Sequence, residues 1–385
     1  MSSELKFDES TLRGVVEDVL RGLGQTSSAL TPSKPEEDCA CATKPRAVSM
    51  GKGKHGVFQT AGEAAQAASV AFGELRKLGV AGRDKVVNIV KTMTFDKAEE
   101  WGKLELAETK IGRLDHKIAK LLGLRNVPGT EWLSPYGMSG DHGISMEEYT
   151  PFGVIGAITP VTHSIPTLSG NIINMVAAGN TLVINAHPNG ARCAAVAVRE
   201  FNQAIEREIG IPNVVTIVET PSLDSFNELC ASEDVNLLCV TGGPGVVNAA
   251  MKSGKRSICA GPGNPPVLVD ETANLDKAAE GIIFGGSFDN NLLCIGEKEI
   301  FVVDAVYNKF LEALKKAGAA QLNKSQLDRL TQAAFTDSKD AGGCSHPVLN
   351  RDLVGRDPSV LADIAGASIA SGTELLFAET DADHP

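Results

Sequence analysis

Apolar and polar positions divide the chain of 385 residues into a short helix, a linker and a globular body. Apolar residues recur three and four positions apart from Leu12 to Leu23, and this spacing predicts an amphipathic helix within residues 1–24. Residues 25–54 are rich in Ser, Thr, Pro, Gly and charged residues, which predicts a flexible linker. Because a single helix has no core of its own, we expect it either to fold back on the body or to dock on a partner.

The body begins at about residue 55, and its apolar pattern changes period along the chain. Alanine-rich helical patterns fill residues 61–122, and the stretch SPYGMSGDHGIS (134–145) has no regular period, so we expect it to be irregular. Six apolar runs follow, separated by spacers long enough for crossover helices. The runs are GVIGAIT, TLVINA, NVVTIVE, VNLLCVTGG, PPVLVDE and EIFVV. This alternation predicts an α/β fold with a parallel sheet.

Charge and hydropathy restrict the kinds of partner and compartment. The formal net charge is −12, which argues against nucleic acid or an anionic membrane as the main partner. No apolar run approaches the roughly 20 residues that a membrane span requires. The N-terminal residues lack the basic and apolar regions of a secretory signal. We therefore expect a cytoplasmic protein.

Eight cysteines are scattered along the chain, and they suggest one candidate nucleophile. No Cys or His spacing completes a zinc set, so we expect no metal site and a reducing compartment. Cys294 stands out because it lies between a small polar loop and a strand-like run, in GGSFDNNLLCIGEKEIFVV. Its position alone leaves two interpretations open, a reactive nucleophile or a buried thiol.

Two glycine-rich segments could bring the backbone close to a ligand. The run Thr241-Gly242-Gly243-Pro244-Gly245 joins a strand to a helix, where free N–H groups favour a phosphate. Asn248 replaces the last glycine of a dinucleotide fingerprint, so a purely structural turn is an equal alternative. The segment AGPGNPP, which begins at Ala260 and Gly261, is rigid and precedes a strand, and it has the same two interpretations.

The segment PFGVIGAITPVTHSIPT places polar residues after a strand. Thr159, Pro160, Thr162 and His163 follow GVIGAI at the carboxyl end of the strand, where open α/β sheets bind ligands. The Thr162 hydroxyl could donate a hydrogen bond to a developing oxyanion. His163 has either a direct role or the more common role of a structural histidine.

Taken in order, PFGVIGAITP, AAGN, TGGPG, AGPGNPP and SFDNNLLC resemble motifs of the aldehyde dehydrogenase superfamily. Within it, the chain is similar to the CoA-acylating aldehyde dehydrogenases of bacterial microcompartments, from GKGKHG (51–56) to the C-terminus. The resemblance implies a Rossmann-type NAD-binding domain at 55–257, with part of an oligomerisation arm near 135–152. It also implies an α/β catalytic domain at 258–385, which stops short of the family's Glu-x-x-Met-Pro segment. The helix at 1–24 looks like an encapsulation peptide that docks on shell proteins in the microcompartment lumen.

The resemblance also assigns the chemistry. It implies that Cys294 attacks a short-chain aldehyde, that hydride passes to NAD⁺, and that coenzyme A takes the acyl group as co-substrate. Thr162 and His163 would hold the oxyanion with the backbone N–H of Cys294, although the family usually has Asn where this chain has His163. The residues assigned to NAD are Thr159, Pro160, His187, Pro188, Thr241, Gly242, Gly243, Gly245, Ala260 and Gly261.

The product depends on one position of the family alignment. Hydrolytic members use a glutamate in a Glu-Leu-Gly-Gly-Lys motif to activate water, and matching that motif onto AGPGNPP places Ala260 there. Without a base, we expect the thioester to persist until a CoA thiol removes it. The alternatives are a hydrolytic aldehyde dehydrogenase and an inactive shell-docking scaffold. The resemblance further implies a homo-oligomer, a dimer or a tetramer.

Overall fold

The computed structural model describes residues 53–339, 345–381 and 384. The chain divides between residues 49 and 50, and the description below concerns the unit from residue 50 onward. The predicted helix at 1–24 and nearly all of the predicted linker at 25–54 lie outside the described residues, so both stay predictions.

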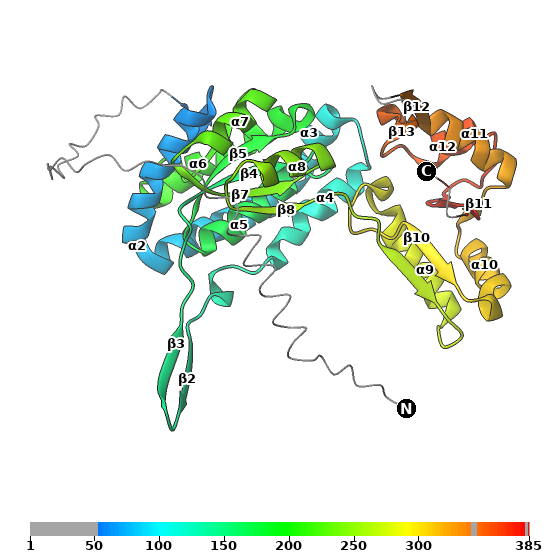
Figure 1. Ribbon diagram of the computed structural model, residues 1–385, viewed down its shortest axis with the longest axis horizontal. Coiled ribbons are helices and arrows are strands. Elements are labelled where there is room, and N and C mark those ends of the chain that lie inside the picture. The colour runs from blue at the N-terminus through cyan, green and yellow to red at the C-terminus, as the bar shows by residue number, and fades with distance from the viewer. Residues whose placement is uncertain (1–52, 340–344, 382–383, 385) are drawn as a thin grey trace, which may run out of the picture. The chain divides into compact units, whose positions relative to one another are not determined.

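A parallel sheet of six strands forms the first part of this unit, in the order β1-β6-β5-β4-β7-β8 (Figure 1). The strands are β1 Val57–Phe58, β4 Val154–Thr159, β5 Thr181–Ala186, β6 Val215–Val218, β7 Val235–Thr241 and β8 Ser257–Ala260. Every neighbouring pair is parallel. The prediction of an α/β fold with a parallel sheet is therefore confirmed, and four of the six apolar runs are strands of this sheet.

The strand order reverses direction at β4. The chain continues from β4 to β5 and β6 on one side, and then returns to β7 and β8 on the other side. The connecting helices are α5 Ser164–Ala177, α6 Ala191–Ile209, α7 Leu223–Ala231 and α8 Pro244–Lys252. Ligands of open α/β sheets bind at such a reversal, outside the carboxyl ends of the strands. Here the reversal lies between β4 and β7.

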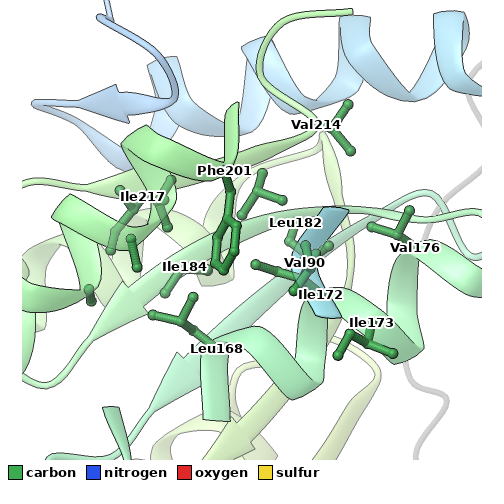
Figure 2. Close-up of a cluster of buried hydrophobic side chains, with 14 of the residues drawn as sticks. Val90, Leu168, Ile172, Ile173, Val176, Leu182, Ile184, Phe201, Val214 and Ile217 are labelled. Carbon is green, nitrogen blue, oxygen red and sulfur yellow. The ribbon is translucent and has the colours of Figure 1, made fainter. Parts of the chain in front are cut away.

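Helices cover both faces of the sheet, so successive residues of one strand enter two different cores. Leu182 and Ile184 pack in the core that α5 and α6 complete, while Val183 between them packs with α7 and β7. Figure 2 shows the first core, in which Leu168 of α5 and Phe201 of α6 lie near these strand residues. A parallel sheet that is buried on both faces explains the continuous apolar runs in the sequence.

The helical prediction for residues 61–122 is confirmed, with breaks between helices. The helices are α2 Ala61–Asp96, α3 Ala98–Thr109 and α4 Leu114–Gly123. Gly79 interrupts α2 with a positive φ of 63°, a conformation that glycine adopts without steric cost. Short 3-10 turns are η2 Leu124–Asn126, η3 Thr130–Trp132, η4 Pro188–Gly190, η5 Phe288–Asn291, η6 Asp304–Val306 and η7 Arg351–Leu353.

The expectation of an irregular stretch at 134–145 is wrong. Strands β2 Tyr136–Gly140 and β3 Gly143–Glu147 form an antiparallel hairpin, closed by a two-residue turn between Gly140 and Gly143. All of its strand residues are exposed, and they include the apolar side chains of Met138 and Ile144. Glycine and serine interrupt the apolar positions, so the period of a strand is hard to detect in the sequence.

The second part of the unit has its own small sheets. Strands β9 Pro266–Val269 and β10 Glu299–Val302 form a parallel pair, packed with α9 Leu275–Ser287 and α10 Tyr307–Lys316. PPVLVDE and EIFVV are thus strands, but they do not join the six-stranded sheet. The remaining elements are β11 Ala320–Gln321, α11 Lys324–Ala334, β12 Phe335–Lys339, β13 Ser345–Leu349, α12 Pro358–Ala365 and β14 Leu376–Phe377. Strand β8 crosses the predicted domain boundary at 257/258, and the boundary itself stays a prediction.

Among the described residues, no helix is both long and apolar enough to span a bilayer.

Burial of β5 leads to a stability prediction. Ile184→Ala removes a fully buried side chain and leaves a cavity, so the free energy of unfolding should fall by about 2–5 kcal/mol. Ile258→Ala in β8 is the matched control, because this isoleucine is 60% exposed, and its effect should stay below about 1 kcal/mol. Chemical denaturation of both variants measures the difference. Equal effects would contradict the assignment of the core.

Candidate active site

Four neighbouring strands bring most of the predicted cofactor residues to one edge of the sheet. Thr159 ends β4, and its carbonyl oxygen accepts a hydrogen bond of 3.0 Å from the backbone N–H of His187, which follows β5. Thr241 at the end of β7 pairs with Ala260 at the end of β8. The backbone N–H of Gly242 donates to the Ala260 carbonyl oxygen at 3.1 Å. Segments about 100 residues apart in sequence therefore meet at the strand reversal.

The N-terminus of one helix, α8, lies at this edge. Helix α8 begins directly after Gly243, which provides no side-chain cap for the first N–H groups. A Cβ atom added at Gly243 or Gly245 would meet no other atom within 4 Å, so the backbone there borders open space. Free N–H groups at the positive end of a helix dipole suit an anionic group such as a pyrophosphate.

Two buried polar atoms at the reversal point have no partner among the described residues. They are the hydroxyl oxygen of Thr159 and Nδ1 of His163, which lies at the start of α5. Burial lowers the pKa of His163 well below its usual value, and the charges of Lys120 and Lys117 lower it further. His163 is therefore neutral at pH 7. Unpartnered buried polar atoms and the open N-terminus of α8, both at this edge of the sheet, fit a polar ligand such as a nicotinamide dinucleotide.

His187 is also held in its neutral form. Partial burial lowers its pKa, and the positive charge of Arg351 acts in the same direction. The ring Nδ1 accepts a hydrogen bond of 3.1 Å from the backbone N–H of Asn189. Nδ1 is thus the acceptor nitrogen, and Nε2 carries the proton. His187 can therefore donate one hydrogen bond toward a ligand.

Cys294 is an exposed thiol, which excludes the interpretation as a buried one. A Cβ atom added at Gly263 would overlap the carbonyl oxygen of Cys294, so only glycine allows the AGPGNPP segment to approach this closely. Cys193 differs from it, because this thiol is fully buried in α6 and desolvation raises its pKa far above the usual range. Within the described part of the chain, Cys230, Cys239 and Cys259 are half-buried.

A lysine lies under the loop that carries Cys294. The Lys298 Nζ donates hydrogen bonds to the carbonyl oxygens of Leu293 at 2.8 Å and Gly296 at 3.1 Å. Burial lowers the pKa of Lys298, while the charges of Cys294 and Glu297 act in the opposite direction. Lys298 therefore holds the backbone on both sides of Cys294.

Three carboxylates lie within five residues of Cys294 in the sequence, and each contacts another group. Asp289 binds Lys120. Glu299 accepts a hydrogen bond from the side chain of Asn264. The carboxylate of Glu297 lies against Gly285. Ala260, three residues before Gly263 in this segment, has no side-chain group that can take a proton. No group of three or more His, Cys, Asp and Glu side chains in residues 53–339 and 345–381 could hold a metal ion.

The turn before Cys294 has an unusual backbone. Asp289, Asn290 and Asn291 have φ angles of 52°, 55° and 59°, in the left-handed region that Asp and Asn tolerate best after glycine. Each side chain anchors the turn to a different neighbour. Asp289 binds Lys120, Asn290 donates to the Gly355 carbonyl oxygen, and Asn291 donates to the carbonyl oxygens of Gly286 and Glu297. The motif SFDNN therefore has Asp and Asn at the three positions that adopt the left-handed conformation.

The structure brings the predicted cofactor residues together at the edge of the sheet and places Gly263 of AGPGNPP against Cys294. The roles assigned to these residues stay predictions. Sequence reasoning missed Lys298, Arg351, Lys120 and Asp289. The motif SFDNN contains Asp289 and could have indicated its importance, but the partner of Asp289 lies 169 positions away and has no local signal.

Known proteins share this sequence and fold. The "Aldehyde dehydrogenase family" profile matches residues 42–341. An acetaldehyde dehydrogenase (acetylating) of Bilophila wadsworthia is 35% identical over 373 residues, which cover 96% of this chain and 74% of the relative.

Two solved structures are similar as well. A Rhodopseudomonas palustris propionaldehyde dehydrogenase, with bound CoA and an acylated cysteine, has a TM-score of 0.79 and 36% identity over 86% of this chain and 74% of its own. A propionaldehyde dehydrogenase from the fucose utilisation bacterial microcompartment of Clostridium phytofermentans has a TM-score of 0.78 and 39% identity at the same coverage. On this evidence, the chain belongs to the aldehyde dehydrogenase family and, within it, to the CoA-acylating enzymes.

Proposed function

We propose that the protein oxidises a short-chain aldehyde and transfers the acyl group to coenzyme A, with NAD⁺ as the hydride acceptor. Aldehyde, NAD⁺ and CoA give acyl-CoA, NADH and a proton. The observation that carries this proposal is the contact between the exposed Cys294 and Gly263, in a segment that has Ala260 where a hydrolytic enzyme has its base. Such a site can form a thioester but has little means to hydrolyse it.

Cys294 begins the reaction as a thiolate, the nucleophilic form of a cysteine. The sulfur attacks the aldehyde carbon, a C–S bond forms, and the carbonyl oxygen becomes an oxyanion. The bound nicotinamide supplies the hydride acceptor. Loss of hydride from the same carbon restores the carbonyl group and leaves a thioester on Cys294.

The oxyanion requires hydrogen-bond donors from the Cys294 loop and from the loop after β4. The candidates are the backbone N–H of Cys294, the hydroxyl of Thr162 and the neutral imidazole of His163, whose Nδ1 has no partner among the described residues. A neutral His163 can donate one hydrogen bond without adding a charge that would repel Lys120. One such donor is typically worth about 100-fold to 1,000-fold in rate.

Transfer to CoA closes the cycle. The CoA thiolate attacks the thioester carbon, the C–S bond to Cys294 breaks, and the Cys294 thiolate is released. One thioester replaces another, so the reaction is reversible and requires no activated water. The aldehyde is a short aliphatic one, such as the acetaldehyde or propionaldehyde for which the relatives are named.

The edge of the sheet would hold NAD⁺ across four strand ends. The N–H groups at the start of α8, from Gly243 onward, suit the pyrophosphate, and His187 has a free Nε2–H for a ribose hydroxyl. The other proposed contacts are Thr159, Pro160, Pro188, Thr241, Gly242, Gly245, Ala260 and Gly261.

Assembly and location follow from two segments outside this site. The hairpin of β2 and β3 exposes Tyr136, Met138, Ile144 and Met146, which favours pairing with a second copy of the chain in a homo-oligomer. The helix predicted at 1–24 would dock on shell proteins and place the enzyme in a microcompartment lumen. The relative from Clostridium phytofermentans comes from a bacterial microcompartment, which supports this location.

The alternatives make different demands on the site. A hydrolytic enzyme requires a carboxylate near Cys294, and the three closest in sequence, Asp289, Glu297 and Glu299, contact other groups. An inactive scaffold would need neither the exposed thiol of Cys294 nor the open N-terminus of α8. The geometry therefore favours the acyl-transfer enzyme.

Replacing the nucleophile tests the activity. Cys294→Ala should lower NADH formation from propanal by at least about 1,000-fold, because no thiohemiacetal can form. Cys259→Ala is the matched control, since Cys259 is a half-buried thiol in β8, and it should keep turnover within about threefold of the wild type. Wild-type turnover should also require CoA. Equal NADH formation with and without CoA would refute the acyl-transfer assignment, and no turnover at all would support the scaffold.

Restoring a base tests the role of Ala260. General-base help is worth about 100-fold to 10,000-fold, so Ala260→Glu should raise CoA-independent formation of carboxylic acid by at least about 10-fold. Ala260→Gln introduces a side chain of nearly the same size as glutamate that cannot take a proton, so it should leave the rate of acid formation unchanged. Chromatography of the acid and of acyl-CoA separates the two products. A gain in both variants, or in neither, would show that the residue at 260 does not decide the fate of the thioester.

A further inference from the structure

A buried cluster of four charged side chains lies between the Cys294 turn and the loop after β4. It contains two carboxylates and two ammonium groups, Glu105 of α3, Lys117 and Lys120 of α4, and Asp289 of η5. The side chains of all four are at most 3% exposed. The reaction proposed above uses none of them.

One lysine contacts both sides of the active site. The Lys120 Nζ lies 2.6 Å from Asp289 Oδ2 and also donates a hydrogen bond of 3.2 Å to the carbonyl oxygen of Thr162. Asp289 belongs to the left-handed turn that precedes Cys294, and Thr162 belongs to the loop of the oxyanion donors. Lys120 therefore joins two segments that lie about 130 residues apart in the sequence.

Other residues in and around the cluster also bind the Cys294 turn and the start of α5. The backbone N–H of Arg113 donates to Asp289 Oδ1 at 2.7 Å, and the backbone N–H of Asp289 donates to His116 Nδ1 at 2.8 Å. On the other side, Glu105 binds Lys117 at 3.2 Å and accepts a hydrogen bond of 3.2 Å from the backbone N–H of Ile165. Both ends of the cluster thus hold the backbone of segments that form the active site.

Stability alone does not explain this cluster. A buried ion pair gains little over apolar side chains of similar size, because both charges lose their hydration. Three successive residues in the left-handed region, by contrast, require outside support to keep their conformation. Catalytic groups must be held within a fraction of an ångström of their working positions. Both arguments favour a positioning role.

We propose that Lys120 is a positioning residue. Its ion pair with Asp289 and its hydrogen bond to Thr162 fix the position of the Cys294 turn (residues 286–297) relative to the loop after β4 (residues 160–167). Lys120 does not touch the substrate. It acts on the distance between the Cys294 sulfur and the donors at Thr162 and His163. The consequence for turnover rests on the proposed function, whereas the coupling of the two segments does not.

Hydrogen exchange tests the coupling without reference to activity. Lys120→Met should accelerate amide exchange by at least about 10-fold in residues 160–167 and 286–297 together, because both segments lose the same anchor. Lys120→Arg keeps a donor and a charge, and it should restore most of the protection. If Lys120→Met does not fold, Lys120→Gln provides the same comparison. Acceleration in only one segment, or in neither, would overturn the proposal.

A control of matched burial separates positioning from general destabilisation. Asn202 is fully buried, and its side chain donates to the carbonyl oxygens of Val198 and Val215, away from the two segments. Asn202→Ala should lower the melting temperature without coupled exchange in 160–167 and 286–297. If Asn202→Ala accelerated both segments as strongly as Lys120→Met, the cluster would have only a structural role.

Kinetics give the second readout. Lys120→Met should lower kcat by about 100-fold, as expected for misplaced reacting groups, while KM for NAD⁺ changes less than about threefold. The double variant Lys120→Met/Asp289→Asn should lose no more than the more impaired single variant, because the two residues act as a pair. Additive losses would overturn the proposal. A wild-type protein without turnover would refute the proposed function, and the exchange experiment would still decide the coupling.

Discussion

The active site depends on a close approach between two backbones, that of the Cys294 loop and that of the glycine-rich segment at Gly263. A side chain at residue 263 would collide with the carbonyl oxygen of Cys294, so the contact exists only because glycine has no Cβ. The approach places a thiol beside a segment that carries Ala260 three residues earlier. In the proposed reaction, the thioester on Cys294 persists because this segment has no side chain that can take a proton from water.

The same loop shows how a strained backbone is held at a reactive residue. Asp289, Asn290 and Asn291 adopt a conformation that most residues avoid, and a separate side-chain contact stabilises each of them in it. Lys298 adds two hydrogen bonds to the carbonyl oxygens around Cys294. These contacts restrict the movement of the loop and so fix the position of the exposed thiol, as the proposed nucleophilic attack requires.

The sequence predicted those features that have a local pattern. The apolar runs at β4, β5, β6 and β7 could be identified as strands because a parallel sheet buries both faces. Thr159, His187 and Thr241 lie at or directly after the carboxyl ends of neighbouring parallel strands, and the sequence assigned them to one cofactor only through the family resemblance. The exposed hairpin was missed because glycine and serine obscure its period. The Lys120–Asp289 pair and the lysine under Cys294 were missed because such contacts join distant positions, and a lysine in a helical pattern is usually a surface residue.

The lifetime of the acyl group on Cys294 tests the account most directly. The protein is mixed with propanal and NAD⁺ in the absence of CoA, and its intact mass is followed with time. The account predicts that one propionyl group attaches to the Cys294 peptide with one NADH per active site, and that it persists until added CoA removes it as propionyl-CoA. Rapid return to the unmodified mass with release of propionic acid, or a propionyl group on another residue, would contradict it.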